Sequence, residues 1–238
     1  MEFTTTFLKK EEIARETFTF HFEKPASFDF IPGQYVKIAL LLEHPDNRGG
    51  IRLFSMSSSP TEPEIVITNK KRESAFKQKL ISLEPGVQIP MSGPFGVFTL
   101  KKEETAPRVF IAGGIGITPF RSMIKYAADT GLSSQITLFT SFHVPEEIVF
   151  QNELRDIAKN HQWFTFVETV SHPQGSSTPW SGHTGRIDEE FIRTNVQNIS
   201  QAIFYICGPP LMVESLTKTV LALGINTSQL RVERFTGY

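Results

Sequence analysis

Cysteine is almost absent from this 238-residue chain, which contains only Cys207. A single thiol cannot form an intrachain disulfide, and it cannot supply the roughly four cysteines that an iron–sulfur cluster needs. The chain also lacks an apolar run of the ~18 residues that span a bilayer, and residues 1–10 are too polar for a signal peptide. We therefore expect a cytoplasmic protein without membrane insertion. The wide spacing of His161, His172 and His183 predicts no metal site.

An excess of either charge is also lacking, because 24 Lys and Arg residues stand against 25 Asp and Glu residues. This balance gives no reason to expect a nucleic-acid partner. The hydrophobic fraction of 39% is ordinary for a globular protein, and the length favours two domains.

The first part of the chain consists of short apolar runs separated by turn residues. Residues 17–22 alternate with period two, and further strands are expected at 35–42, 64–68 and 97–100, with one helix at 74–83. This spacing predicts a closed or nearly closed antiparallel β-barrel. The charged, proline-tipped connector 101–107 marks a domain boundary, so we expect domains at 1–102 and 103–238.

The second part alternates longer units. Its strands are expected at 109–112, 136–140, 164–170, 202–207 and 229–235, and its helices at 119–129, 147–160 and 210–223. Alternation of this kind predicts an α/β domain, with a parallel sheet covered by helices on both faces.

A glycine-rich turn follows the first of these strands. It contains Gly113, Gly114 and Gly116, and the next helix opens with Thr118 as the expected N-cap and Pro119 as its first residue. Glycines let the main chain approach a ligand, and free N–H groups at a helix N-terminus suit a diphosphate. A glycine-rich turn without a ligand is the alternative. Because Pro119 replaces the third glycine and no acidic residue ends the strand 136–140, a standard Rossmann dehydrogenase fits poorly.

Two shorter motifs also carry candidate chemistry. In Arg52-Leu53-Phe54-Ser55 the guanidinium could grip a diphosphate, the aromatic ring could cover a planar cofactor, and the hydroxyl could bond its edge. The alternative is an ordinary exposed barrel strand. The run Cys207-Gly208-Pro209-Pro210 ends a predicted strand at the carboxyl edge of the sheet, where open α/β folds bind ligands, although a buried cysteine usually serves packing.

The order of the motifs resembles that of the ferredoxin–NADP reductase superfamily of FAD-dependent NAD(P)H oxidoreductases. The resemblance covers nearly the whole chain and is carried by these motifs: Arg52-x-Phe54-Ser55, Gly93-Pro-Phe-Gly96, Gly113-Gly-x-Gly-x-Thr-Pro119, Cys207-Gly-Pro-Pro210 and Glu233-x-Phe235. It implies that the barrel binds FAD and that the α/β domain binds NADH or NADPH.

The resemblance also implies roles for residues of the barrel domain. Arg52 would contact the FAD diphosphate, Phe54 the flavin and ribityl region, and Ser55 the flavin N5 edge. Leu53, between them, would also belong to the cofactor-binding residues. Lys77 would give a second diphosphate contact where the family frequently has serine or threonine, although it could equally lie on a solvated helix face. Phe54 stands where the family often has tyrosine, and the lost hydroxyl could loosen flavin binding.

In the α/β domain, Gly113, Gly114, Gly116, Thr118 and Pro119 would border the nicotinamide nucleotide. Cys207 and Glu233 would lie beside the reacting atoms, with Gly208 and Pro209 on the same edge. Either Phe235 or Tyr238 would cover the flavin. Because Phe142 stands where many relatives have an arginine for the 2′-phosphate, we expect NADH rather than NADPH, unless Arg186 compensates.

The resulting prediction is an enzyme that takes hydride from NADH or NADPH onto FAD. It would pass electrons to a separate acceptor, such as a ferredoxin, a flavodoxin, an oxygenase component, a haem protein or a small molecule. One alternative is a flavin reductase that uses flavin as a diffusing substrate. Another is a regulatory subunit that binds flavin or nucleotide without catalysis.

Overall fold

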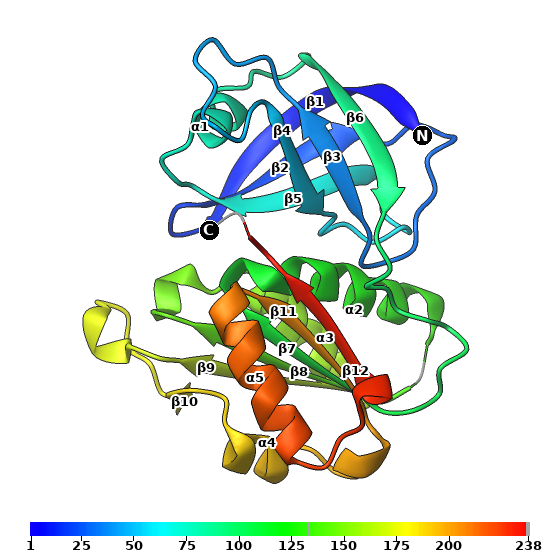
Figure 1. The fold of residues 1–238 in the computed structure, drawn as a ribbon, viewed down its shortest axis with the longest axis vertical. Helices are drawn as coiled ribbons and strands as arrows, with labels where there is room; N and C mark the ends of the chain where they lie inside the picture. Colours follow the sequence, from blue (N-terminus) through cyan, green and yellow to red (C-terminus); the bar gives the residue numbers. More distant parts are fainter. Residues whose placement is uncertain (133, 237–238) are drawn as a thin grey trace.

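The computed structural model describes residues 1–132 and 134–236, which build two β-sheets, one above the other (Figure 1). We call residues 2–95 the barrel lobe and residues 108–236 the α/β lobe. No helix in the described part of the chain combines the length and the apolar character that crossing a bilayer takes.

The barrel lobe is a six-stranded antiparallel sheet that curls until its edges meet. Its strands run in the order β4-β3-β6-β1-β2-β5, and a bridge between Met56, the residue after β4, and Ile67 of β5 joins the two edges. The alternation predicted for residues 17–22 is explained by this curl, since Phe20 and Phe22 lie fully buried inside it. The predicted barrel is confirmed. The elements are β1 (Glu2–Ala14), β2 (Thr17–Glu23), β3 (Tyr35–Ala39), β4 (Ile51–Ser55), β5 (Glu64–Lys70), α1 (Ala75–Ile81) and β6 (Gln88–Phe95).

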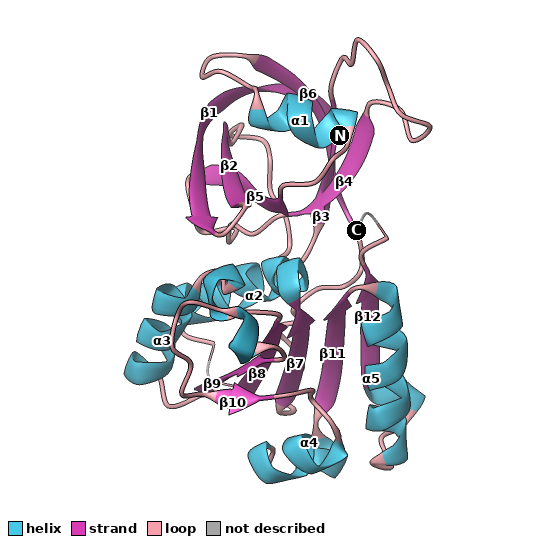
Figure 2. Ribbon diagram, turned by 90° about the vertical axis from the view of Figure 1, so that its left-hand side faces the viewer, coloured by secondary structure: helices cyan, strands magenta, loops and turns pink. Residues whose placement is uncertain are grey.

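The α/β lobe is a six-stranded parallel sheet in the order β10-β9-β8-β7-β11-β12. Its helices cover both faces (Figure 2), as predicted. In β11, Tyr205 and Cys207 face the core under α2 and α3, whereas Phe204 and Ile206 face α4 and α5. The elements are β7 (Arg108–Gly113), α2 (Thr118–Thr130), β8 (Ile136–Phe142), α3 (Gln151–Asn160), β9 (Phe164–Val170), β10 (His183–Thr184), α4 (Glu189–Asn195), β11 (Ile203–Gly208), α5 (Pro210–Ala222) and β12 (Leu230–Arg234).

Three details of the sequence prediction are wrong. Residues 97–100 form no strand; instead Phe98 and Leu100 are buried in the core of the α/β lobe. Thr118 is not an N-cap, because a 3₁₀ turn (Gly114–Ile117) runs directly into α2 and puts Thr118 inside the helix. Helix α3 begins at Gln151 rather than near 147, since Phe150 takes a left-handed conformation that interrupts the helical path. The division of the chain at residue 102 stays a prediction.

Candidate functional site

A cleft of about 510 Å³, here called the seam cleft, lies where the two lobes meet. The barrel lobe contributes β4, the end of β5 and α1, and the α/β lobe contributes the start of α2 and the end of β12. The chain reaches this seam at the end of β12 (Figure 1). Eight sequence-predicted residues line it, namely Arg52, Leu53, Phe54, Ser55, Lys77, Thr118, Glu233 and Phe235.

A second cleft of about 470 Å³, here called the edge cleft, adjoins the first at the carboxyl end of the parallel sheet. The ends of β7 and β8 and the start of α5 line it, including the predicted residues Gly113, Gly114 and Pro209. Lys70, Arg72 and Ile115 line both clefts, so the two are neighbours. One elongated ligand could therefore extend through both clefts, or two ligands could meet at the seam.

The barrel side of the seam cleft concentrates positive charge. Arg48, Arg52, Arg72 and Lys77 all line it. Burial, and then the three guanidinium groups, lower the pKa of Lys77 to about 8. Cations that destabilise one another in this way are relieved by a bound anion, and a diphosphate has the required charge. Sequence reasoning assigned Arg52 and Lys77 to a diphosphate and took the segment that begins at Arg72 as the start of the barrel helix, but it missed Arg48.

The guanidinium of Arg52 is already engaged by the loop before β4. It donates to main-chain carbonyls within 48–51, each 2.8 Å away, and to Oδ1 of Asp46 at 2.9 Å. It also lies over the ring of Phe76, 5.1 Å from the centroid. A phosphate bound by Arg52 must therefore compete with Asp46.

The aromatic and hydroxyl groups of β4 have different surroundings. The ring of Phe54 packs against Phe76 with centroids 5.9 Å apart, which fixes one wall of the cleft. Ser55 is buried at the inner end of the strand, whereas Leu53 lies at the rim and is 57% exposed. The arrangement suits a planar group held against Phe54 with its polar edge toward Ser55.

On the opposite wall, Glu233 of β12 pairs in register with Cys207 of β11. Burial raises the pKa of Glu233 to about 7, and its Oε2 atom is buried without a hydrogen-bond partner among the described residues. Cys207 is fully buried behind the cleft wall, and burial together with Glu233 raises the pKa of its thiol. Glu233 therefore presents a carboxyl group that can hold a proton near neutral pH.

The glycines of the turn after β7 serve mainly to bring main chains together. A Cβ atom on Gly116 would lie 2.4 Å from the carbonyl oxygen of Cys207, and one on Gly113 would lie 2.1 Å from Sδ of Met212. Gly208, for its part, abuts the main chain of Gly113. Gly114 differs, because it has a φ of +51° and no atom within 4 Å of its Cβ position. Gly114 is thus the glycine of this turn that leaves open space.

The remaining predicted residues frame this region. Pro119 is buried in the first turn of α2, and Pro209 precedes α5. The main-chain N–H of Phe235 donates to the carbonyl of Gly208 over 2.9 Å, which fixes the end of β12 beside the seam cleft. Tyr238, the other candidate for covering a flavin, lies outside the described residues.

The far end of the edge cleft holds a cluster that sequence reasoning missed. The rings of His143 and His172 lie 4.1 Å apart, and Oγ of Ser171 is 3.3 Å and 3.0 Å from their respective Nδ1 atoms. The pairing of β8 with β9 places Phe142 beside Val170, so the residues after each strand meet. A correct alignment of these two parallel strands could have predicted this contact.

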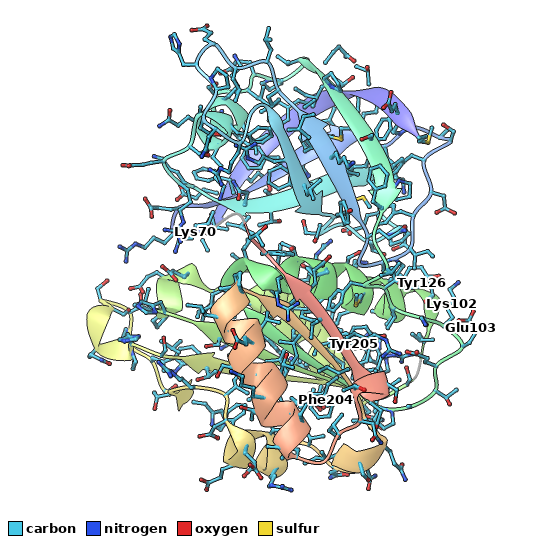
Figure 3. The ribbon with its side chains drawn as sticks, in the orientation of Figure 1. Lys70, Lys102, Glu103, Tyr126, Phe204 and Tyr205 are labelled. Atoms are coloured by element: carbon cyan, nitrogen blue, oxygen red, sulfur yellow. The ribbon has the colours of Figure 1, made fainter. Side chains whose placement is uncertain are left out.

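Sequence reasoning also missed Lys70, at the end of β5. Its ammonium group pairs with Glu147 of the α/β lobe, with Nζ 2.5 Å from Oε1. Figure 3 labels Lys70 on the lower side of the barrel lobe, facing the other lobe. The ion pair therefore spans the seam beside both clefts.

The family model for an oxidoreductase NAD-binding domain matches residues 110–218. The reductase component of propane 2-monooxygenase from Rhodococcus jostii (strain RHA1) is 27% identical over 90% of this chain and 57% of its own length. The glycine betaine monooxygenase reductase subunit from Chromohalobacter salexigens is 26% identical over 92% and 60%. The chain thus spans about three fifths of the length of these relatives.

Solved structures share the whole fold. The flavohaem-like FAD/NAD-binding domain of nitric oxide dioxygenase from Vibrio cholerae aligns with a TM-score of 0.85 at 22% identity, covering 98% of both chains. A ferredoxin–NADP⁺ reductase from Neisseria gonorrhoeae aligns with a TM-score of 0.82 at 20% identity, again covering 98% of both. Residues 110–218 therefore match an oxidoreductase NAD-binding domain, and the chain shares the two-lobed fold of these solved structures.

Proposed function

We propose that this chain is an FAD-dependent reductase that oxidises NADH or NADPH and passes electrons to a separate acceptor. The observation that carries the proposal is the composition of the seam cleft. One wall offers clustered cations, Phe54 and Ser55, and the other offers Thr118, Glu233 and Phe235. These are the groups that a diphosphate-bearing flavin and a nicotinamide would each require.

Bound FAD would supply the redox chemistry, accepting a hydride with its two electrons as NADH becomes NAD⁺ and then releasing the electrons to the acceptor. The chain's own residues would bind and orient the FAD and shield it from water. Arg52 and Lys77 would hold the diphosphate, Phe54 and Phe235 would contact the flavin, and Ser55 would hydrogen-bond its edge. Glu233 would hold a proton beside the ring, since burial raises its pKa to about 7.

The nicotinamide nucleotide would occupy the edge cleft, with its diphosphate near Gly114 and the start of α2. We propose NADH as the preferred donor, because Phe142 ends β8 and His143 follows it, and neither side chain is an arginine or lysine that could bind a 2′-phosphate. Comparing the rates of flavin reduction by NADH and by NADPH tests this preference.

The relatives suggest the kind of acceptor. Those described above are reductase components of monooxygenase systems, as their names state. We propose that this chain likewise serves an oxygenase component. Electron delivery would be tested by adding a candidate oxygenase to the NADH-reduced protein and following its reduction anaerobically.

A flavin reductase that releases its flavin is the second candidate. The engagement of Arg52 by Asp46 favours it, because that ion pair opposes the diphosphate contact. Gel filtration separates the two candidates: a protein that emerges yellow holds FAD as a cofactor, whereas a colourless one that still oxidises NADH with added flavin uses it as a substrate.

The proposal as a whole is tested by mixing FAD-loaded protein with NADH or NADPH without oxygen. We expect at least one nucleotide to bleach the flavin absorption within seconds. If neither does, the chain is no reductase, and the third possibility, a regulatory subunit without catalysis, takes its place.

A further inference from the structure

Arg121 of α2 contacts both lobes although it lines neither the seam cleft nor the edge cleft. Its guanidinium donates to Glu62 of the barrel lobe (Nη2 to Oε1, 2.9 Å) and to Glu153 of α3 (Nη2 to Oε1, 2.7 Å). A further bond runs from Nη1 to the carbonyl oxygen of Ser57, 2.9 Å away. One side chain thus ties the α/β lobe to two points of the barrel lobe.

The next residue of the helix adds an independent tie. The hydroxyl of Ser122 donates to the carbonyl oxygen of Ser58 over 2.6 Å, and Ser122 is fully buried. Consecutive side chains of α2 therefore hold consecutive carbonyls of the barrel lobe. The segment they hold is itself fixed in the barrel, because the N–H groups of Ser57 and Ser58 donate to Val66 of β5.

This contact between the lobes lies close in the chain to residues on both walls of the seam cleft. Ser57 and Ser58 lie two and three residues after the end of β4, which carries Phe54 and Ser55 in the seam cleft. Arg121 lies one helical turn after Thr118, which lines the same cleft from the opposite lobe. A short rigid path therefore links the two walls of the cleft through α2.

Glu62 and Glu153 keep the buried guanidinium of Arg121 charged. The Arg121 side chain is 13% exposed. Burial alone would lower the pKa of its guanidinium, but Glu62 and Glu153 more than reverse that effect, so its pKa lies above the ordinary value. The group stays charged at every working pH, and removal of either carboxylate weakens a buried, hydrogen-bonded charge.

We propose that Arg121 is a positioning residue, which sets the separation between the Ser55 wall and the Thr118 wall of the seam cleft and thereby the geometry of hydride transfer. The inference rests on the proposed function, since it assigns the two walls to the two reacting rings. Hydride transfer is sensitive to such spacing, because a misplacement of about 1 Å can cost on the order of 100-fold in rate.

The chain offers a matched pair of variants for the test. Glu62→Gln and Glu153→Gln each remove one negative charge from the same guanidinium, but only Glu62 lies in the barrel lobe. In stopped-flow experiments at saturating NADH, we expect Glu62→Gln to slow flavin bleaching about tenfold or more while FAD content and NADH affinity stay within about twofold. Glu153→Gln is expected to stay within about threefold of the parent.

Hydrogen exchange supplies a readout that does not depend on activity. We expect the main-chain amides of Ser57 and Ser58 to lose protection in Glu62→Gln and to keep it in Glu153→Gln. The milder Ser122→Ala should slow bleaching to an intermediate rate, which keeps the test valid if Glu62→Gln folds poorly.

The outcomes separate the two proposals. If the flavin of the parent protein is bleached as expected and that of Glu62→Gln is bleached equally fast, Arg121 has no positioning role, and the proposed reductase function stands. Equal slowing in Glu62→Gln and Glu153→Gln also overturns it, because the effect then does not depend on the tie between lobes. A parent that neither nucleotide bleaches overturns the proposed function itself.

Discussion

At the scale of single residues, Lys77 gives the most direct test of the proposed diphosphate site. Its pKa of about 8 results from burial and from Arg72, Arg48 and Arg52. An anion bound beside it favours its charged form, so FAD should bind with uptake of protons and lose affinity as the pH rises through about 8.

We expect Lys77→Gln to weaken FAD binding about 10- to 100-fold at pH 7, as the loss of a charged hydrogen bond of roughly 1.5–3 kcal/mol implies. The difference between pH 7 and pH 9 should shrink in the variant. Flavin fluorescence titrations measure both effects. Lys79→Gln, an exposed lysine on the same helix, is the control. If both variants bind FAD alike, Lys77 has no part in the site.

Glu233 gives a prediction about stability. Its pKa rises from 4.5 to about 7 on folding, because burial disfavours the charged form. The folded state therefore holds this proton more tightly, and the associated stability is complete below pH 4.5 and is lost as the pH rises through about 7.

Glu233→Gln carries no charge at any pH and avoids this loss. We expect the variant to be more stable than the parent by up to about 3 kcal/mol at pH 8, but by only about 1 kcal/mol at pH 5. Urea unfolding at the two pH values measures the difference, with the exposed Glu190→Gln as the reference substitution. A difference that does not change between pH 5 and pH 8 would contradict the raised pKa.

At the scale of elements, the turn between β7 and α2 depends on two glycines for different reasons. Gly116 meets the carbonyl of Cys207 at 2.4 Å from its Cβ position, whereas Gly114 has open space but a φ of +51°. Gly116→Ala should destabilise the protein by about 1–3 kcal/mol through overpacking and displace η1 (Gly114–Ile117) from β11. Gly114→Ala should cost about 1 kcal/mol through backbone strain alone.

Denaturant unfolding distinguishes the two causes when it is combined with NADH binding. Displacement of η1 in Gly116→Ala should also weaken the binding of NADH, since the turn adjoins the edge cleft. Equal stability loss and equal NADH affinity in the two variants would show that the close contact at Gly116 plays no special part.

The elements also show what local sequence can and cannot predict. Strands with clear alternation, such as residues 17–22, and runs of buried residues, such as β7, were predicted because their burial pattern is written in short stretches. The prediction of a strand at 97–100 was wrong because Phe98 and Leu100 are apolar for another reason, namely that they are buried in the α/β lobe. The polar strand β1 was not predicted, because it is held by pairing with β2 and β6, and the local sequence contains no signal of that pairing.

The same limit applies to the site. The family resemblance pointed to Arg52, Lys77 and Glu233 through their place in the chain order. Arg48, Lys70 and the contact of His172 with His143 were missed, because they follow from a loop, from the contact between the lobes and from the pairing of β8 with β9. Residues that act across the seam are visible only once the two lobes are placed together.

At the scale of the whole molecule, the Lys70–Glu147 pair ties the lobes beside both clefts. Glu147→Gln frees the ammonium group for an anionic ligand, so we expect NADH to bind about three- to tenfold more tightly in this variant and more weakly in Lys70→Gln. Both affinities should depend on salt. Titrations of NADH binding at two ionic strengths measure this, and unchanged affinity in both variants would show that the pair does not compete with the ligand.

Both lobes are expected to build one site across their seam. A crystal structure of the protein with FAD and NAD⁺ tests this most directly. We predict the isoalloxazine between Phe54 and Phe235 with its diphosphate at Arg52 and Lys77, and the nicotinamide beside Thr118 and Glu233. Either molecule bound at a surface away from the seam would contradict the account.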